Sequence, residues 1–210
     1  MLVNHVPDNK IKYFRRRTIT WGKKNFADFP WRHATNQWHA LVAELMLQRT
    51  KAEQVLPEYL SFCNTYQSPQ EYIASSAPSP FISLGLHWRS ETFKKLAEVL
   101  AHRELPLDKS QLLQLPGIGD YIASAFLSLH VGIREPIIDS NIVRLYGRFF
   151  GFATDGETRR KRWFIELAER LTPARNFKDF NYAVIDLTRT ICKPKPLCSK
   201  CLLKRKCSHL

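Results

Sequence analysis

The chain of 210 residues carries a formal net charge of +13, from 32 Lys and Arg against 19 Asp and Glu. A surplus of that size indicates a polyanionic partner, with nucleic acid as the leading candidate. The sequence contains no apolar run of ~18 residues and no signal-peptide core. We therefore expect a cytoplasmic, nucleoid-associated protein with no membrane partner. Only 8 glycines leave few positive-φ positions for the turns of an antiparallel sheet, which favours an all-helical fold.

Apolar residues recur at helical spacing along most of the chain. In residues 37–66, Trp38, Leu41 and Leu45 stand at i, i+3 and i+7, the face of a helix turned towards a core. Further helices are expected over residues 91–103, 120–132, 139–151, 158–171 and 179–192. The stretch 120–132 is almost wholly apolar, so we expect its helix to be central.

One ionisable residue, Glu44, interrupts the apolar stretch ALVAELML (40–47). A carboxyl group buried there suits a proton donor, or a side chain that hydrogen-bonds a base extruded from nucleic acid. The alternative interpretation is a salt bridge to an arginine or a turn that faces solvent.

Two glycines precede a helix in the stretch LPGIGDY (115–121). Such a loop lets consecutive backbone amides and the positive end of the helix face one phosphate group. Leu115, Gly117 and Gly119 are therefore candidate contacts to a nucleic-acid strand, independent of base sequence. The alternative is a tight turn between two helices without a ligand.

Asp139 follows twenty residues after Gly119, in the stretch PIIDSN. Its position before a helix predicts an N-cap. The functional interpretation uses the same geometry, because a carboxylate at a helix start can stabilise a cationic sugar transition state or orient a water molecule.

Four of the five cysteines lie in the last 19 residues, in a C-x5-C-x2-C-x5-C array. They are Cys192, Cys198, Cys201 and Cys207. Crowding of this kind, with no export signal expected, indicates thiolate ligands of a metal centre rather than disulfides. Structural zinc sites usually pair their cysteines around a longer loop, so the single compact loop favours a [4Fe-4S] cluster, with zinc as the alternative. Cys63 stands alone in an apolar segment, which predicts a core residue.

The hairpin, the aspartate and the cysteine tail together make the chain similar to the helix-hairpin-helix DNA glycosylases, the superfamily of endonuclease III and MutY. The resemblance covers nearly the whole chain, through the motifs DFPWRHA, ELMLQRT, LPGIGDYIASAFLS, IIDSNIVRLYGRFFG, DFNYAVIDL and the cysteine tail. It implies an all-helical fold of two lobes with DNA in the cleft between them. Residues 26–133 would form a six-helix barrel lobe with its helix-hairpin-helix motif near 111–130, and residues 1–25 and 134–210 a [4Fe-4S] cluster lobe.

The resemblance also implies roles for single residues. Asp139 matches the aspartate that these enzymes use at the anomeric carbon of the sugar. Tyr121 stands where members with an additional lyase activity carry a lysine that forms a Schiff base, and a phenol forms no imine. We therefore expect a monofunctional glycosylase that leaves an abasic site in an intact strand. The first cysteine spacer has five residues where relatives usually have six, and we expect the loop to absorb the difference.

Two subfamilies lack that lysine: MutY, which removes adenine opposite oxidised guanine, and the thymine glycosylases that act on G:T mismatches. Glu44 matches a catalytic glutamate of MutY but is also present in the thymine enzymes. The segment GLHWRS (85–90), and an arginine at position 49 where MutY usually has glutamine, depart from the MutY pattern. These departures favour the thymine enzymes.

Four loop residues then become candidate DNA contacts. Gln48 and Arg49 are candidates for filling the hole left by the flipped base, and His87 and Trp88 for contacting the opposite guanine. The alternative is that all four are ordinary surface loop residues.

The resemblance thus implies a monomeric, monofunctional DNA glycosylase of base excision repair, which removes thymine or uracil from G:T and G:U pairs in double-stranded DNA. A wobble pair costs less to open than a matched pair, which contributes to its selection. MutY-type adenine removal is the alternative enzyme activity. An alternative of another class is a non-catalytic, metal-stapled DNA-binding protein.

Overall fold

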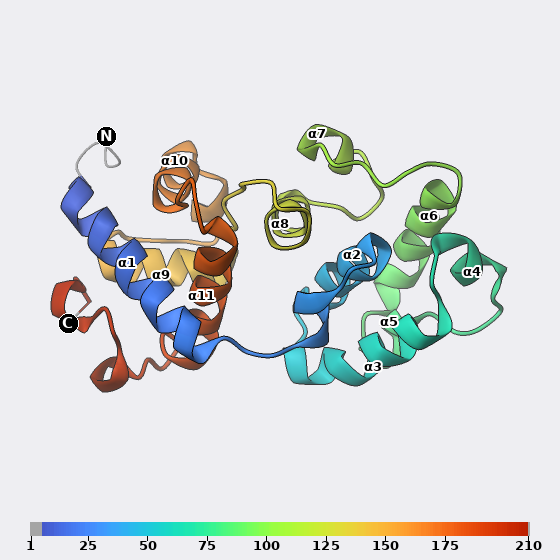
Figure 1. Cartoon of the computed structure of the whole chain (residues 1–210), viewed down its shortest axis with the longest axis horizontal. Coiled ribbons are helices and arrows are strands. Elements are labelled where there is room, and N and C mark those ends of the chain that lie inside the picture. The colour runs from blue at the N-terminus through green and yellow to red at the C-terminus, as the bar shows by residue number, and fades with distance from the viewer. Residues whose placement is uncertain (1–5, 210) are drawn as a thin grey trace. The chain divides into compact units, whose positions relative to one another are not determined.

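The structure is a computed structural model that describes residues 6–209. Residues 1–5, which belong to the expected cluster lobe, lie outside the described residues. The expectation of an all-helical fold is confirmed, since every regular element in the described range is a helix or a helical turn. The chain divides into two compact units, which are labelled in Figure 1 by their helices. The central unit is Asp28–Val131, and the terminal unit combines the segments up to Ala27 and from Gly132.

The central unit contains seven of the described α-helices and three short helical turns. The α-helices are α2 (Gln37–Met46), α3 (Ala52–Thr65), α4 (Pro69–Ala74), α5 (Pro80–Ser83), α6 (Ser90–Ala101), α7 (Lys109–Leu112) and α8 (Asp120–Ala125). The turns are η2 (Pro30–His33), η3 (His87–Arg89) and the π-helical η4 (Phe126–Val131), which continues α8.

Side-chain caps fix where several of these helices begin. The amide oxygen of Asn36 accepts hydrogen bonds from the backbone nitrogens of Trp38 and His39 at the start of α2. Ser68 and Ser79 cap α4 and α5 in the same way, each followed by a proline at the first helical position. These caps satisfy backbone N–H groups that have no partner within the helix.

The apolar run over residues 37–66 forms two helices, α2 and α3, rather than one. The chain turns between them, and Arg49 adopts a left-handed conformation with φ of 62°. A non-glycine residue in that region is uncommon and stops an α-helix. The turn leaves Arg49 exposed and Gln48 half-buried at the end of α2 instead of placing them on a continuous helix face.

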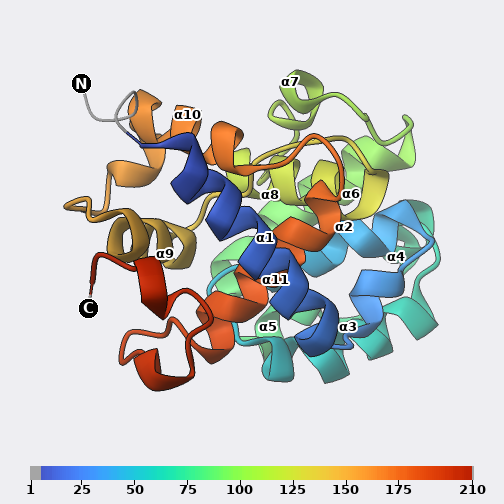
Figure 2. The ribbon, with the colours of Figure 1, turned by 60° about the vertical axis from the view of Figure 1, so that its left-hand side comes forward.

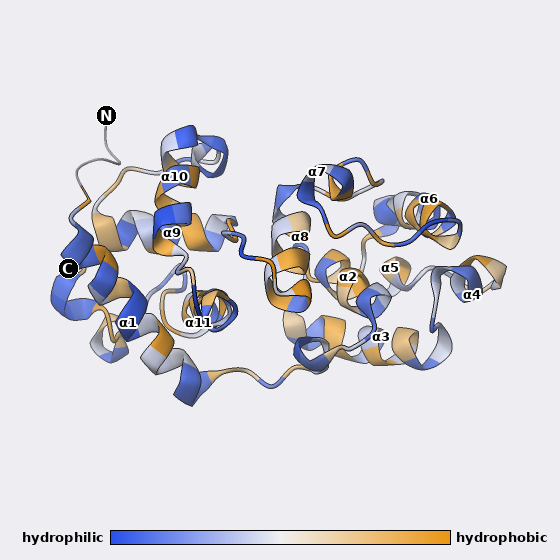
Figure 3. Ribbon diagram, turned by 45° about the horizontal axis from the view of Figure 1, so that its top comes forward, coloured by the Kyte–Doolittle hydropathy of each residue, from blue (hydrophilic) through white to orange (hydrophobic). Residues whose placement is uncertain are grey.

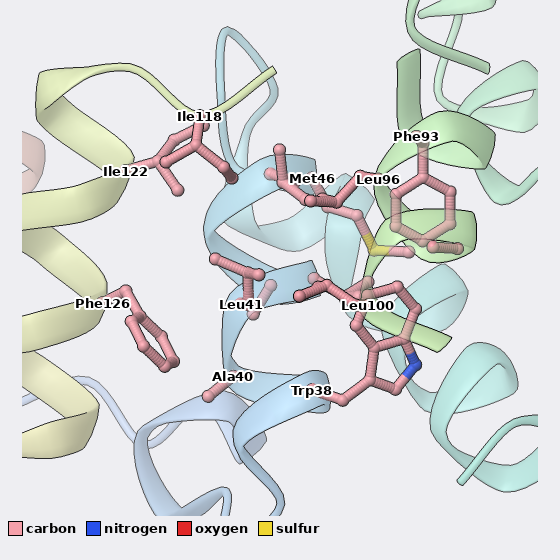
Figure 4. Close-up of a cluster of buried hydrophobic side chains, with 14 of the residues drawn as sticks. Trp38, Ala40, Leu41, Met46, Phe93, Leu96, Leu100, Ile118, Ile122 and Phe126 are labelled. Carbon is pink, nitrogen blue, oxygen red and sulfur yellow. The ribbon is translucent and has the colours of Figure 1, made fainter. Parts of the chain in front are cut away.

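The core of the central unit forms around α2. Figure 4 shows Leu41 of α2 between Phe126 and Ile122 on one side and Leu96 and Leu100 of α6 on the other. Seven of the ten residues of α2 are hydrophobic and buried, which the sequence pattern of an almost wholly apolar helix predicts.

The terminal unit joins both ends of the chain. Its elements are α1 (Asp8–Asn25), α9 (Ser140–Phe150), η5 (Thr158–Arg160), α10 (Arg162–Leu171), α11 (Phe177–Thr190), η6 (Cys198–Lys200) and η7 (Lys204–Lys206). α1 lies side by side with α11 (Figure 2). Gly22 permits this close approach, because a Cβ atom there would stand 2.4 Å from Cβ of Ala183. Phe14 of α1 packs against Tyr146, with ring centroids 5.5 Å apart.

Figure 3 shows how hydropathy is distributed over the helices. α2 and α8 are mostly orange, whereas α1 and α10 alternate between orange and blue. The amphipathic helices therefore keep one polar face, and the apolar ones form the centre of their unit. Among the described residues, no helix has the length and apolarity that a membrane crossing requires.

Candidate active site

The hairpin predicted from LPGIGDY lies between α7 and α8, both in the central unit. Gly117 has φ of 77°, and a Cβ atom there would stand 2.8 Å from Cγ2 of Thr92, so this position requires glycine for two reasons. Gly119 is the N-cap of α8, and a Cβ atom would meet no described atom within 4 Å. Leu115 is buried as a whole residue, and its backbone N–H and carbonyl groups are hydrogen-bonded to Leu112 and Ile118, so it shapes the turn from inside.

Arg89 organises the turn that carries Gln48 and Arg49. Its Nη1 donates a hydrogen bond of 2.8 Å to the carbonyl oxygen of Leu45, and its Nη2 donates to the side-chain oxygen of Gln48. Burial, and secondarily the charge of Arg49, lowers the pKa of Arg89 to about 10. A buried guanidinium with two defined acceptors holds the last turn of α2 in one geometry.

The loop residues expected to contact DNA are partly brought together. Gln48, Trp88 and Gly117 line one pocket of the central unit, which also includes Arg89 and Pro116. Trp88 is 64% exposed, and the guanidinium carbon of Arg89 lies 4.6 Å from the centroid of its ring. Large exposed aromatic rings beside backbone amides suit stacking on a nucleotide base.

His87 and Arg49 are both exposed and do not line that pocket. His87 begins the turn η3, which Trp88 and Arg89 complete. Their exposure leaves both side chains free to meet a ligand from solvent.

Glu44 is buried inside the central unit, as the sequence predicted, and it is paired. Its Oε1 lies 2.9 Å from Nε2 of His130, and both side chains are 3% exposed. The sequence had suggested an arginine as the alternative partner, and this is wrong, since the partner is a histidine 86 residues later in the chain. A carboxyl group and an imidazole at this distance can share or exchange a proton.

Tyr121 is the second residue of α8 and belongs to the same unit as Glu44. Its side chain is half-buried and packs against the hydrophobic core of the unit. The aromatic ring thus has a packing role in the core, and its half-exposure leaves part of it accessible to a ligand.

Asp139 is the N-cap of α9 in the terminal unit. Its Oδ1 accepts a 2.7 Å hydrogen bond from the backbone nitrogen of Ile142, and its Oδ2 accepts a 2.9 Å bond from the side-chain amide of Asn141. The buried phenol of Tyr146 lies nearby, and its pKa is raised by burial and then by the charge of Asp139. The side chain of Asp139 is half-buried, so its carboxylate is held by hydrogen bonds and is still accessible to a ligand.

The cysteine tail surrounds one pocket of the terminal unit. All four tail cysteines line it, together with side chains of α9 and the end of α11. Among residues 6–209, no three Cys, His, Asp or Glu side chains are grouped as ligands of a single ion. Burial raises the pKa of the Cys201 and Cys207 thiols, and a bound metal centre would supply the positive charge that favours their thiolates. Four thiols around one pocket fit an inorganic cluster held from several sides.

Two arginines of α9 form hydrogen bonds with the backbone of the cysteine tail. Arg144 donates hydrogen bonds of 3.1 and 2.9 Å to the carbonyl oxygen of Cys192. Arg148 donates to the carbonyl oxygens of Lys193 and Pro194, at 2.7 and 2.9 Å, and its Nη1 stands 3.7 Å from the sulfur of Cys192. The five-residue first spacer is therefore anchored by α9.

Part of the positive charge has a structural role. Besides Arg144 and Arg148, Arg15 of α1 donates a 3.0 Å hydrogen bond to the carbonyl oxygen of Leu171 at the end of α10. Arg134 bonds the carbonyl oxygen of Thr172 at 2.7 Å. These guanidinium groups donate to backbone carbonyl oxygens, so part of their hydrogen-bonding capacity is used within the fold, although their charge still counts in the +13 surplus.

Sequence reasoning missed two residues of the site, His130 and Arg89. His130 is the one titratable side chain of the apolar stretch IASAFLSLHVG. A single ionisable residue in an apolar stretch is the same signal that identified Glu44. Arg89 lies in the GLHWRS segment beside two residues that were identified. Its burial depends on a contact with α2 that local sequence does not reveal.

Comparison with known proteins gives named relatives. No family model matches the chain. The thymine-DNA glycosylase of Aeropyrum pernix is 36% identical to it, over 95% of this chain and 95% of its own length. The thymine/uracil-DNA glycosylase of Methanothermobacter thermautotrophicus is 31% identical, over 96% of this chain and 95% of its own length. An adenine DNA glycosylase of Buchnera aphidicola is 29% identical, over 94% of this chain but 59% of its own length.

Solved structures give the same picture. A thermostable thymine-DNA glycosylase matches with a TM-score of 0.88 and 31% identity, over 96% of this chain and 97% of that one. A trapped endonuclease III–DNA covalent intermediate matches with a TM-score of 0.83 over 97% of both chains, and at 20% identity this is a likeness of fold alone.

Proposed function

The chain belongs to the DNA glycosylases of the helix-hairpin-helix superfamily, with thymine/uracil-DNA glycosylases among its relatives, and from this premise we propose that it removes thymine or uracil from G:T and G:U mispairs. The reaction is hydrolysis of the N-glycosidic bond of a flipped nucleotide. Water supplies the hydroxyl group on C1′, and the base leaves with the electron pair of the broken bond. The product is an abasic site in an intact strand.

The observation that carries the proposal is the position of Asp139. Its carboxylate is held at the start of α9 by two hydrogen bonds while its side chain stays half-exposed. We infer that it stabilises the cationic sugar that forms as the base departs, and orients the attacking water. Fixed charge of this kind needs no rearrangement during the reaction.

The absence of lyase chemistry follows from Tyr121. A phenol at this position of α8 forms no imine with C1′, so strand cleavage by a Schiff base has no nucleophile there. Glu44 is proposed to hydrogen-bond the extruded base. Both residues come from the central unit.

The proposed grip on DNA uses backbone and aromatic groups. The amides of the Gly117–Gly119 turn and the start of α8 suit a phosphate group. Gln48 and Arg49 are proposed to fill the space of the flipped nucleotide, and Trp88 with His87 to contact the estranged guanine.

The cysteine pocket is proposed to hold a [4Fe-4S] cluster on Cys192, Cys198, Cys201 and Cys207. When bound, the cluster supplies four metal–thiolate bonds that fix the fold of the tail. The lysines and arginines of η7 then present positive charge at a defined surface for phosphate groups. We further propose a monomer that works on the chromosomal DNA of the cytoplasm.

Incubation with synthetic duplexes tests the function. Purified protein is mixed with duplexes that hold G:T, G:U, oxidised-guanine:A or G:C pairs, and abasic sites are then cleaved with alkali. We expect product from G:T and G:U and none from G:C. Product from the oxidised-guanine:A duplex alone would replace the proposal with adenine removal. Binding to all duplexes without any product would indicate a non-catalytic DNA-binding protein.

A further inference from the structure

The pair formed by Glu44 and His130 occupies the interior of the central unit. Each side chain is 3% exposed, and Oε1 of Glu44 lies 2.9 Å from Nε2 of His130. A buried carboxyl group with no partner is costly. Both residues therefore depend on one hydrogen bond between α2 and η4.

His130 lies in η4, which has π-helical geometry. In a π-helix the backbone hydrogen bonds reach five residues along the chain, so the turn holds an extra residue, and such turns are frequent at functional sites. The preceding part of this helix packs on α2, and Figure 4 shows Ile122 and Phe126 directed towards Leu41 and Ala40. The rings of His130 and Phe126 stack at 6.3 Å with 30° between their planes. His130 is thus held from one side by an aromatic ring and from the other by Glu44.

A further titratable group near Glu44 comes from α3. Tyr59 is buried, and its pKa is raised by that burial and then by the nearby Cys63 and Glu44. A phenol with a raised pKa stays neutral, so Tyr59 adds no charge beside Glu44.

With one proton between Glu44 and His130, Glu44 offers a ligand the same hydrogen-bonding group whichever of the two residues carries the proton. If Nε2 of His130 carries the proton, it donates to Oε1 and Glu44 is a carboxylate. If Oε1 carries the proton, it donates to Nε2. In both cases the second oxygen of Glu44, Oε2, can only accept a hydrogen bond.

The bases that glycosylases remove differ in what they offer to such an acceptor. Thymine and uracil carry an N3–H donor between two carbonyl oxygens, and they leave as anions that those oxygens stabilise. Adenine requires a proton on a ring nitrogen before it leaves easily, which calls for a donor. A group that only accepts hydrogen bonds therefore favours the two pyrimidines.

We propose that His130 is a specificity-determining residue, which keeps Glu44 a hydrogen-bond acceptor so that Glu44 selects bases with an N3–H donor. The inference rests on the proposed function, because Glu44 must meet the extruded base. His130 acts through Glu44 and is a positioning residue rather than a catalytic one. His130 thus has a proposed role although sequence reasoning did not identify it.

The test compares uracil with N3-methyluracil, which lacks the donor. Single-turnover rates are measured on duplexes with each base opposite guanine, for the wild type, His130→Gln and His130→Leu. We expect the wild type to remove uracil at least about tenfold faster than the methylated base, since a site built around a hydrogen bond rejects an analogue that lacks it. His130→Gln keeps an N–H donor for Glu44 and should preserve this ratio. His130→Leu removes the partner that fixes Oε1 of Glu44, so neither oxygen keeps a defined hydrogen-bond role, and the ratio should fall below about threefold.

A matched control separates specificity from stability. His39 is a buried histidine of α2 whose Nε2 lies 2.7 Å from the carbonyl oxygen of Tyr66, away from Glu44. His39→Leu should lower the melting temperature but leave the uracil to N3-methyluracil ratio unchanged. If His130→Leu does not fold, Glu44→Gln takes its place, since an amide N–H replaces the acceptor and should reduce the ratio in the same way.

The outcomes are distinct. A wild type that releases neither thymine nor uracil defeats the proposed function itself. A wild type that releases uracil but removes the methylated base equally fast overturns this inference alone. The same holds if the folded His130→Leu variant, or Glu44→Gln, slows both substrates equally and keeps the wild-type ratio.

Discussion

Arg89 and Gln48 are joined side chain to side chain across 41 residues of sequence, by a hydrogen bond from the guanidinium to the amide oxygen. The same guanidinium bonds the carbonyl oxygen of Leu45 and lies against the ring of Trp88. One buried cation thus fixes the turn after α2 relative to the aromatic ring proposed to meet the estranged guanine. The two loops are positioned together before any ligand arrives.

Replacing Arg89 with methionine should loosen this arrangement. We expect a loss of about 2 kcal/mol in the free energy of unfolding, since the carbonyl oxygen of Leu45 loses its donor in a buried setting. Excision from G:T should slow by at least about tenfold, because Gln48 is no longer held. Urea unfolding and single-turnover kinetics measure the two effects. The exposed Arg103→Met serves as control, and an unchanged excision rate in Arg89→Met would remove Arg89 from the positioning of this loop.

The two hairpin glycines should respond differently to alanine. Gly117→Ala forces a side chain into the left-handed region and against Thr92, so we expect a destabilisation of at least about 1 kcal/mol. Gly119→Ala meets open space and should leave stability within about 0.5 kcal/mol, yet its methyl group stands where a phosphate would approach the start of α8. Thermal unfolding and DNA-binding titrations distinguish the two. Gly119→Ala with wild-type affinity for DNA would argue against a phosphate contact at this turn.

Sequence reasoning predicted what local chemistry determines. The stretch DSNIVRLYGRFFG indicated a helix capped by Asp139 and ended by Gly151, and α9 follows this, with Gly151 at φ of 85°. The apolar surroundings of Glu44 likewise indicated its burial, which the structure confirms. In these cases residues close in sequence supply the whole signal.

What sequence reasoning missed depends on contacts between distant segments. His130 meets Glu44 from 86 residues away along the chain and lies in the π-helical turn η4, which no local pattern signals. The break after α2 was missed because the apolar spacing over residues 37–66 continues through it, whereas the left-handed conformation of Arg49 and the bond of Arg89 to Leu45 are visible only in the structure. The roles of Asp139 and Tyr121 in catalysis stay predictions.

The cysteine pocket leads to a spectroscopic prediction. Protein purified without air should be yellow-brown and contain about four iron atoms per chain, as a [4Fe-4S] cluster requires. Cys198→Ser should lose colour and iron and lower the melting temperature, because the tail loses its metal–thiolate bonds. Cys63→Ser, at a half-buried cysteine outside the tail, should keep both. Colourless protein with one zinc ion would refute the cluster.

Asp155 should contribute to stability in a defined pH range. Hydrogen bonds from Lys161 and then Thr158 lower its pKa to about 2, from an ordinary value of 3.8. A carboxylate with a lowered pKa in the folded state stabilises the fold above pH 3.8, and this stabilisation disappears as the pH falls towards 2. Asp155→Asn should therefore show a shallower loss of melting temperature across that interval. Glu104→Gln, at an exposed carboxylate, controls for net charge, and an equal slope in Asp155→Asn and wild type would contradict the assignment.

Asp139→Asn tests the chemical step with little disturbance of the fold. Asparagine caps a helix about as well as aspartate, so the free energy of unfolding should change by less than about 0.5 kcal/mol. Base release should fall by at least about a hundredfold, because a neutral amide does not stabilise a cationic sugar. Affinity for mismatched DNA should be unchanged or higher, since one negative charge has been removed. Asp108→Asn is the matched control, because Asp108 caps α7 through a 3.1 Å hydrogen bond from the backbone nitrogen of Gln111. The alkali-cleavage assay and a binding titration on the same duplex decide the matter: if Asp139→Asn releases thymine as fast as Asp108→Asn, the carboxylate has only a capping role.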